Sequence, residues 1–360
     1  MDSARAEFCR KTPGGVGEGD RDVAGCPAIA VTRPERGPGP DFAEMMARYL
    51  GAPAVAWLAD DDVTEIYANP QDAQVRLDTR SRGKVATGQA IPRERLEMFL
   101  NAVASAQGTL LAPTAPAIQA ELPERIFHGA RLQGFVPPAT PGPAMVIRKR
   151  PTCAYPLDSY VDRGLLPLAW RDVLRGAVAA HETIVVAGGT GTGKSTMLGA
   201  LLLEIARHCP GERVVVLEDT VELECPVPDH LALRTTPELS LAALVKATLR
   251  TSPTRIVIGE VRDAAALDFL DAAVTGHPGS LCTVHASTAV GALRRLDRLA
   301  QRANVPPQAQ LVADAIDLVV VLAGTHRTRR VTSLARVSGL DSDGRYLLHH
   351  CTETGTWIAA

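Results

Sequence analysis

The sequence predicts an α/β protein whose main domain has a mostly parallel sheet and follows a smaller α+β domain. In the second half of the chain, short apolar runs alternate with longer amphipathic segments, the order that a parallel sheet with helical crossovers requires. In the first half, alternating strands are grouped with separate helical stretches, which is typical of an α+β arrangement. The chain has 360 residues and 46% hydrophobic content, enough for two cores.

Composition and periodicity divide the chain into four regions. Residues 1–40 are rich in glycine, proline and charge, and we expect a disordered tail there. Residues 41–147 are expected to form the α+β domain, and residues 161–355 the α/β domain. The proline-containing segment 148–160 is expected to be a stiff linker between the two.

The elements of the first domain follow from the spacing of apolar side chains. Residues 42–50 and 93–106 have helical spacing. Residues 63–69 and 75–78 alternate between apolar and polar on either side of a turn, which predicts a hairpin. Further strands are expected at 117–122, 127–135 and 144–148.

In the second domain, the expected strands and helices follow one another along the chain. Strands are expected at 183–187, 213–217, 231–234, 255–258 and 280–285. Helices are expected at 166–180, 194–208, 239–251, 264–275 and 288–302, and a C-terminal set of segments, 308–316, 317–322, 330–337 and 345–350, is expected to close the domain. Because each early strand is followed by a helix, these strands are expected to run parallel.

Charge and cysteine content exclude several classes of protein. The net charge is −2, so bulk or sequence-specific nucleic-acid binding is not expected. The 7 cysteines are scattered without a paired C-x-x-C, which supports neither a zinc ribbon nor a disulfide framework and favours a cytoplasmic location. Residues 1–11 lack the apolar core of a secretory signal, and the longest charge-free stretch, 101–120, is too polar to span a bilayer. Any membrane association is therefore expected to be peripheral.

The most informative motif is a phosphate-binding loop between an expected strand and an expected helix. It comprises Gly188, Gly189, Thr190, Gly191, Thr192, Gly193, Lys194 and Ser195, with Thr196 directly after it. This is a complete G-x-x-x-x-G-K-[ST] sequence, whose backbone N–H groups and helix N-terminus bind phosphate oxygens. We expect Lys194 to reach the β- and γ-phosphates and the Ser195 hydroxyl to hold Mg²⁺.

Two acids and a histidine stand where expected strands end. Glu260 follows the apolar run 256–259, Glu218 follows 214–217, and His285 follows 281–284. At the carboxyl edge of a parallel sheet these groups lie beside the phosphate loop. Glu260 is expected to orient the attacking water, Glu218 to help organise Mg²⁺, and His285 to bond a phosphate oxygen or orient a catalytic acid. A transition-metal site formed by His277, Cys282 and His285 is less favoured, because no fourth ligand is nearby.

Four motifs occur in one order: 188–195, 217–223, 259–262 and 275–286. This order resembles the Walker A, Asp-box, Walker B and His-box sequence of the bacterial secretion (traffic) ATPases, which have a RecA-like P-loop ATPase domain. Residues 63–69, 131–138 and 146–149 resemble the type IV secretion, conjugal-transfer (TrbB-like) branch in particular. Departures are Ala265, where an acid is usual, and Ser287, where an asparagine is usual.

The resemblance implies a ring-forming ATPase, a homo-hexamer, that uses ATP and Mg²⁺. It implies a cytoplasmic protein associated peripherally with the inner membrane, with secretion or conjugation apparatus proteins as partners. Family members bring arginines of the first domain to the phosphates, and Arg131 and Arg148 are the matching candidates for a catalytic role. Arg250 and Arg262 are further candidates.

Two alternatives remain open at this point. One is a pilus-assembly ATPase of the tight-adherence type, within the same family. The other is a docking switch that binds ATP and gates a partner without substantial turnover. The acid at 260 and the histidine at 285 argue against the switch, and the near-neutral charge argues against a helicase or DNA-packaging motor.

Overall fold

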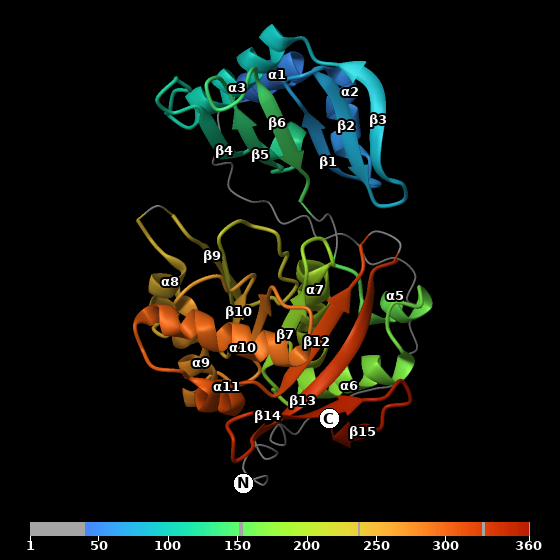
Figure 1. The fold of residues 1–360 in the computed structure, drawn as a ribbon, viewed down its shortest axis with the longest axis vertical. Helices are drawn as coiled ribbons and strands as arrows, with labels where there is room; N and C mark the ends of the chain where they lie inside the picture. The colour runs from blue at the N-terminus through green and yellow to red at the C-terminus, as the bar shows by residue number, and fades with distance from the viewer. Residues whose placement is uncertain (1–39, 151–153, 237, 326–327, 360) are drawn as a thin grey trace.

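The computed structural model describes residues 40–150, 154–236, 238–325 and 328–359. The expected tail, apart from residue 40, and residues 151–153 of the expected linker lie outside the described residues. The described chain forms two domains, one above the other in Figure 1, each with its own sheet.

The first domain is built on a six-stranded antiparallel sheet with strand order β3-β2-β1-β6-β5-β4. Its strands are β1 (Val63–Ala68), β2 (Gln74–Thr79), β3 (Gly83–Ala90), β4 (Ala117–Glu121), β5 (Arg131–Phe135) and β6 (Ala144–Arg148). The hairpin expected from alternation is confirmed as β1 and β2. Strand β3 was not predicted, because its residues are small or polar and it lies largely exposed at the sheet edge.

Helices cover one face of this sheet. They are α1 (Pro40–Leu50), α2 (Ala52–Ala59), α3 (Arg93–Ala106) and α4 (Glu124–Phe127). Alternate residues of β5 and β6, such as Leu132 and Ile147, are buried and pack into one hydrophobic core with α3. The strand predicted at 127–135 begins only at Arg131, since Phe127 ends α4 and Gly129 has a φ of 62° that turns the chain.

The second domain is built on a nine-stranded sheet with strand order β15-β14-β13-β12-β7-β11-β10-β8-β9. Its strands are β7 (Ile184–Gly188), β8 (Val214–Glu218), β9 (His230–Arg234), β10 (Arg255–Ile258), β11 (Leu281–Val284), β12 (Leu318–Ala323), β13 (Arg330–Leu340), β14 (Tyr346–Cys351) and β15 (Trp357–Ala359). Strands β7 to β12 pair parallel to one another, and β13 to β15 extend one edge antiparallel. The predicted α/β fold with a mostly parallel sheet is therefore confirmed.

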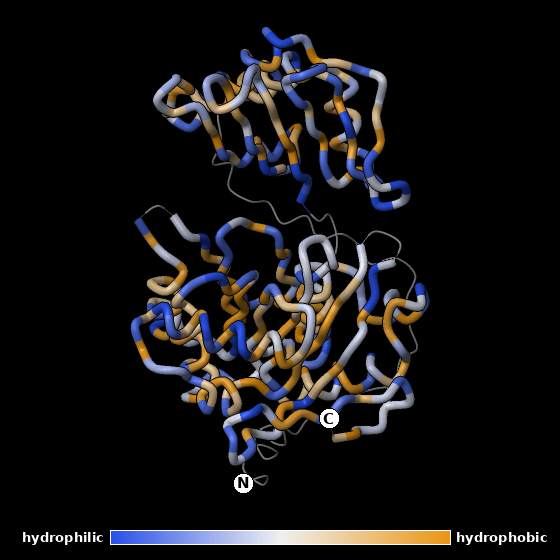
Figure 2. Tube along the Cα trace, in the orientation of Figure 1, coloured by the Kyte–Doolittle hydropathy of each residue, from blue (hydrophilic) through white to orange (hydrophobic). Residues whose placement is uncertain are grey.

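Two groups of helices sandwich this sheet (Figure 1). One face carries α5 (Leu157–Asp162), α6 (Leu168–Ala179) and α7 (Lys194–His208). The other carries α8 (Leu241–Thr248), α9 (Ala265–Thr275), α10 (Ala289–Ala300) and α11 (Ala309–Ala315). A short 3₁₀ turn, Gln301–Ala303, lies between α10 and α11. Every residue of β7, β8, β10 and β11 is buried, and Figure 2 shows hydrophobic residues along these central strands.

Strand β6 ends at Arg148 and α5 begins at Leu157, so both overlap the segment expected as a linker. Leu157 and Tyr160 of α5 are buried in the core of the second domain. Within the described part of the chain, no helix combines the length and the apolar character needed to cross a membrane.

Candidate nucleotide-binding site

The phosphate loop joins the buried strand β7 to helix α7. A side chain at Gly188 would bring a Cβ to 2.9 Å from the Leu322 carbonyl oxygen of the neighbouring strand, so only glycine fits there. Gly193 directly precedes the helix with a φ of 94°, a conformation that favours glycine. Gly189, Thr190 and Gly191 are exposed at the tip of the loop, where its N–H groups and the helix N-terminus can bind an anion.

Two side chains of the loop also stabilise it from within. Thr192 is buried, and its hydroxyl donates a hydrogen bond of 2.9 Å to the Gly189 carbonyl oxygen. Lys194 is only 8% exposed, and its Nζ donates to the same carbonyl at 3.0 Å. Burial lowers the pKa of Lys194, while the carboxylates of Glu260 and Glu222 act to raise it. The Lys194 ammonium group is thus held against the phosphate loop, close to the carboxylates of Glu260 and Glu222.

Glu260 and His285 lie together beside Lys194, as the sheet order requires. His285 Nε2 lies 3.1 Å from Glu260 Oε1, and Lys194 Nζ lies 3.4 Å from His285 Nδ1. Glu260 also accepts a 2.8 Å hydrogen bond from Arg262. Burial alone would raise the pKa of Glu260, but the hydrogen bond and the charge of Arg262 bring it below its usual value. A carboxylate that stays ionised beside a phosphate site can accept a hydrogen bond from water.

Glu218, at the end of β8, has a different environment. It is 5% exposed, and its Oε1 accepts hydrogen bonds from the backbone N–H groups of Glu222 at 2.9 Å and Leu223 at 3.0 Å. Burial raises its pKa to about 7 despite these two bonds. Its carboxylate therefore fixes the turn that follows the strand.

That turn presents Glu222, which sequence reasoning did not single out. Glu222 Oε2 accepts a 2.7 Å hydrogen bond from the Ser195 hydroxyl of the phosphate loop. Glu222 lies within the motif 217–223, four residues after Glu218. Its place in that motif is the feature of the sequence that could have identified it as a site residue. The sequence offers three acids there and does not tell which one faces the loop.

The two arginines expected from the first domain have different surroundings. Arg131 donates a 3.0 Å hydrogen bond to Glu222 Oε1 and another to the Thr220 hydroxyl, so it crosses from β5 to the second domain. Arg148, paired with Arg131 in the sheet, is half-exposed and lies 3.9 Å from Glu65 in its own domain. In the second domain, Arg250 is exposed after α8, and Arg262 contacts Glu260 as described.

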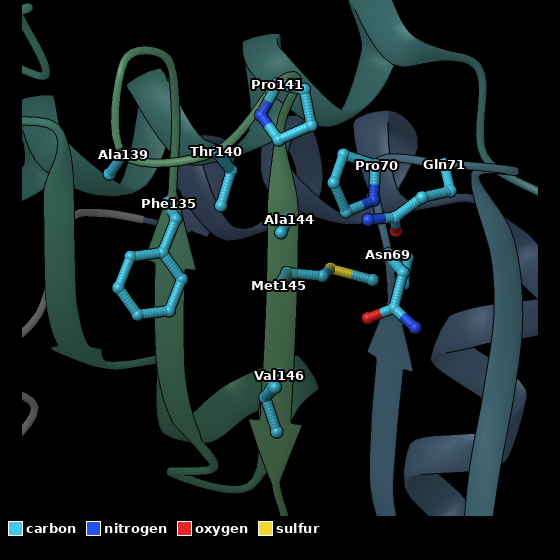
Figure 3. A pocket seen from close by; sticks show the side chains of 11 residues that line it. Asn69, Pro70, Gln71, Phe135, Ala139, Thr140, Pro141, Ala144, Met145 and Val146 are labelled. Carbon is cyan, nitrogen blue, oxygen red and sulfur yellow. The ribbon is translucent and has the colours of Figure 1, made fainter.

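These groups line one narrow cleft between the domains. Its lining is Arg131, Ser195, Glu218, Asp219, Thr220, Glu222, Gly259, Glu260 and Arg262, and its volume is about 30 Å³. A larger hollow of about 410 Å³ lies elsewhere, in the first domain, among the ends of β1 and β5, the start of β6 and the loop before β6. Figure 3 shows that Phe135, Met145 and Asn69 surround it. Among the described residues, no charged side chain lines that hollow.

Comparison with known proteins identifies the family of this chain. The model of a family described as "Type II/IV secretion system protein" matches residues 111–353, more than half of the chain. The chain belongs to this family. A conjugal transfer protein TrbB of Sinorhizobium fredii, described as probable, is 36% identical, over 85% of this chain and 93% of that protein. The type IV secretion system protein PtlH of Bordetella pertussis is 34% identical, over 79% of this chain and 93% of that protein. The conjugal-transfer (TrbB-like) resemblance inferred from the motifs is confirmed.

Solved structures agree on the fold. The ATPase DotB of Legionella pneumophila superposes with a TM-score of 0.57 at 20% identity, covering 86% of this chain and 80% of that one. The pilus retraction motor PilT superposes with a TM-score of 0.55 at 19% identity, covering 82% of this chain and 80% of that one. At such low identity, the similarity to these two structures shows the fold alone. That fold is an N-terminal domain followed by a P-loop domain.

The remaining histidine and cysteine of the His-box motif lie away from the cleft. His277 Nδ1 lies 2.9 Å from the Pro253 carbonyl oxygen, before β11 begins. Cys282 is fully buried within β11, where burial raises its thiol pKa. Of the three residues weighed for a transition metal, only His285 lies beside the phosphate loop.

Proposed function

We propose that this chain hydrolyses ATP, with Mg²⁺, to power a type IV secretion or conjugal-transfer apparatus. The observation that carries the proposal is the meeting of Lys194, Glu260 and His285 at one edge of the sheet, next to the phosphate loop. The names of the relatives at 34–36% identity support the biological role. A pilus-assembly role has weaker support, since the likeness to the retraction motor is one of fold.

The residues at and beside the phosphate loop have separate parts in this proposal. The loop from Gly188 to Thr196 binds the phosphate chain, with Lys194 at the β- and γ-phosphates. The ionised Glu260 accepts a hydrogen bond from water and orients it toward the terminal phosphate, in the direction that an in-line displacement needs. His285 either holds Glu260 in place through the 3.1 Å contact or bonds a phosphate oxygen, because a neutral imidazole has one N–H to donate.

The site fits Mg²⁺ because the groups around Ser195 offer oxygen atoms, the ligands this ion prefers. The Ser195 hydroxyl would hold the ion, and Glu222, its hydrogen-bond partner, would orient the ion's water ligands. Glu218 supports both by fixing the turn that carries Glu222. When bound, Mg²⁺ neutralises charge on the phosphates.

Arg131 extends the site into the first domain. Its guanidinium bonds Glu222 and Thr220, so it can also reach charge that develops on the phosphates. Arg148 remains a second candidate, since its charge acts on both Lys194 and Arg131. We propose that six copies assemble into a ring at the cytoplasmic face of the inner membrane, bound peripherally to proteins of the apparatus. Size-exclusion chromatography with light scattering, with and without ATP, tests the hexamer.

Glu260→Gln tests the catalytic assignment. The amide keeps the size of the side chain but lacks the charge and basicity of the carboxylate, so ATP binding should persist while phosphate release falls about 100-fold or more. Glu353→Gln, a matched change at an exposed site in the turn before β15, is the control and should retain full turnover. Near wild-type turnover in Glu260→Gln would remove Glu260 from the mechanism. Negligible turnover in the wild-type ring, with normal ATP binding, would instead favour the docking switch.

A further inference from the structure

An arginine from the far end of the chain covers the phosphate loop. Arg329 Nη2 donates a 2.8 Å hydrogen bond to the carbonyl oxygen of Gly191, at the tip of the loop. Its Cδ would lie 2.9 Å from a Cβ placed on Gly193, so the arginine stem packs directly against that glycine. None of the motifs used above includes Arg329, and it is separated from Gly191 by 138 positions.

The sheet topology explains how Arg329 reaches this place. Strand β12 is the parallel neighbour of β7, and Leu322 is in register with Gly188, the first residue of the loop. Beyond β12 the chain turns at Gly324, whose φ is 79°, and Thr325 and Thr328 hydrogen-bond to one another across the turn. The turn delivers Arg329 over the loop just before β13 begins.

Arg329 lies on the opposite side of the loop from the hydrolytic groups. The order β12-β7-β11-β10-β8 puts His285, Glu260 and Glu218 on the β11 side of β7 and the arginine on the β12 side. A nucleotide is an elongated ligand whose terminal phosphate must face Glu260. We expect its ribose and base to extend away from β11, toward the side where Arg329 lies.

The surroundings of Arg329 suit a nucleoside. Its Nε is buried and has no hydrogen-bond partner among the described residues. Burial lowers the pKa of Arg329. Two nearby groups also act on this pKa: Tyr160 raises it, and Arg80 of the first domain lowers it. Arg80 also donates a 3.1 Å hydrogen bond to the hydroxyl of Tyr155, whose ring lies 4.9 Å from the Arg163 guanidinium. Arginine side chains can stack on bases and bond ribose oxygens.

We propose that Arg329 is a positioning residue for the nucleoside end of the bound nucleotide. It is anchored at the lip of the phosphate loop by its bond to the Gly191 carbonyl and presents its remaining N–H groups to the ribose and base. This inference rests on the proposed function, since it requires a nucleotide at the loop. It assigns Arg329 to binding, not to the hydrolysis that Glu260 supports.

The test compares full-length Arg329→Ala with Arg330→Ala, which removes the same charge one residue away at an exposed position. Binding of Mg²⁺–ATP and of Mg²⁺–tripolyphosphate, which lacks a nucleoside, is measured by calorimetry, and KM and kcat by phosphate release. For Arg329→Ala we expect ATP affinity to fall and KM to rise by about 10- to 100-fold, the loss typical of a hydrogen bond to a charged donor. Tripolyphosphate affinity and kcat should stay within about threefold of wild type, as should all values for Arg330→Ala.

Equal losses for ATP and tripolyphosphate in Arg329→Ala would overturn the nucleoside assignment, and so would no loss relative to Arg330→Ala. If the wild-type chain bound neither ligand, the proposed function itself would fail, which is a distinct result. Thermal unfolding without nucleotide checks that each variant folds. Should the alanine variant fail to fold, Arg329→Lys keeps the charge but loses the planar fork, and the same selective loss of ATP affinity is expected, in smaller degree.

Discussion

The hydroxyl of Ser195 and the carboxylate of Glu222 are joined by a 2.7 Å hydrogen bond, which links the phosphate loop to the turn after β8. The other oxygen of the same carboxylate bonds Arg131, from the first domain, at 3.0 Å. One acid thus connects the loop of one domain to a strand of the other. The cleft at this point has a volume of about 30 Å³.

Glu222→Gln should reduce ATPase activity and weaken its dependence on Mg²⁺. The amide keeps a hydrogen bond to Ser195 but removes the charge that would orient the ion's ligands, and such outer-shell changes cost about 10- to 100-fold. The measurement is ATPase rate against Mg²⁺ concentration. Glu224→Gln, two residues on and exposed, is the matched control and should follow the wild-type curve. Overlapping curves for all three proteins would show that Glu222 has no part in metal use.

Arg131→Ala should lower kcat more than Arg148→Ala does. Arg131 reaches the cleft and bonds Glu222, whereas Arg148 is half-exposed and lies 3.9 Å from a glutamate of its own domain. An arginine that stabilises transition-state charge contributes factors of about 10³ or more, while exposed ion pairs contribute little. Steady-state phosphate release at saturating ATP measures both. The reverse order of effects would transfer the catalytic assignment to Arg148.

A buried ion pair beneath the sheet should control stability below neutral pH. Arg255 is fully buried and bonds Glu212, which His181 also contacts. Glu212→Gln leaves this charge without its counter-ion, and we expect a loss of about 3–5 kcal/mol in the free energy of unfolding at pH 7. Glu353→Gln at the surface should change it by less than about 0.5 kcal/mol.

The pH dependence of that loss follows from the pKa of Glu212. Burial acts to raise this pKa, but the hydrogen bonds from His181 and Arg255 outweigh burial and lower it to about 2. The stabilisation is therefore complete above the usual value of 4.5 and disappears as pH falls from there through about 2. Urea unfolding from pH 7 to pH 2.5 should show the wild type and Glu212→Gln converging. A constant difference over this range would contradict the assignment.

Glu218 should have the opposite effect on stability. Burial raises its pKa to about 7 from 4.5, so the folded protein keeps the proton to higher pH than the unfolded chain. Stability should fall as pH rises from about 4.5 to about 7, by roughly 3 kcal/mol for this group. Glu218→Gln keeps the acceptor for the backbone N–H groups but does not titrate, so its stability should fall less between pH 5 and pH 8. Parallel profiles for wild type and variant, measured in urea, would contradict a raised pKa.

Much of the fold could be predicted from local patterns, and the exceptions have physical reasons. The buried strands β7, β8, β10 and β11 are mostly apolar along their length, and alternation identified β1 and β2. Strand β3 lacks such a pattern because it lies exposed at an edge, and its pairing with β2 supplies the hydrogen bonds that define it. The predicted strand at 127–135 was too long because Gly129 and α4 interrupt it.

The sequence by itself predicted the ligand class and the chemistry of the site, because the phosphate loop and the acids that follow the strands are recognisable from short runs of residues. Only the tertiary structure decided which members of those motifs meet. It selected Glu222 over its neighbours as the partner of Ser195, gave Arg131 and Arg148 different surroundings, and brought Arg329 to Gly191. These contacts join residues on separate strands or separate domains, and such distances are set by sheet order and domain packing, which no local spacing encodes.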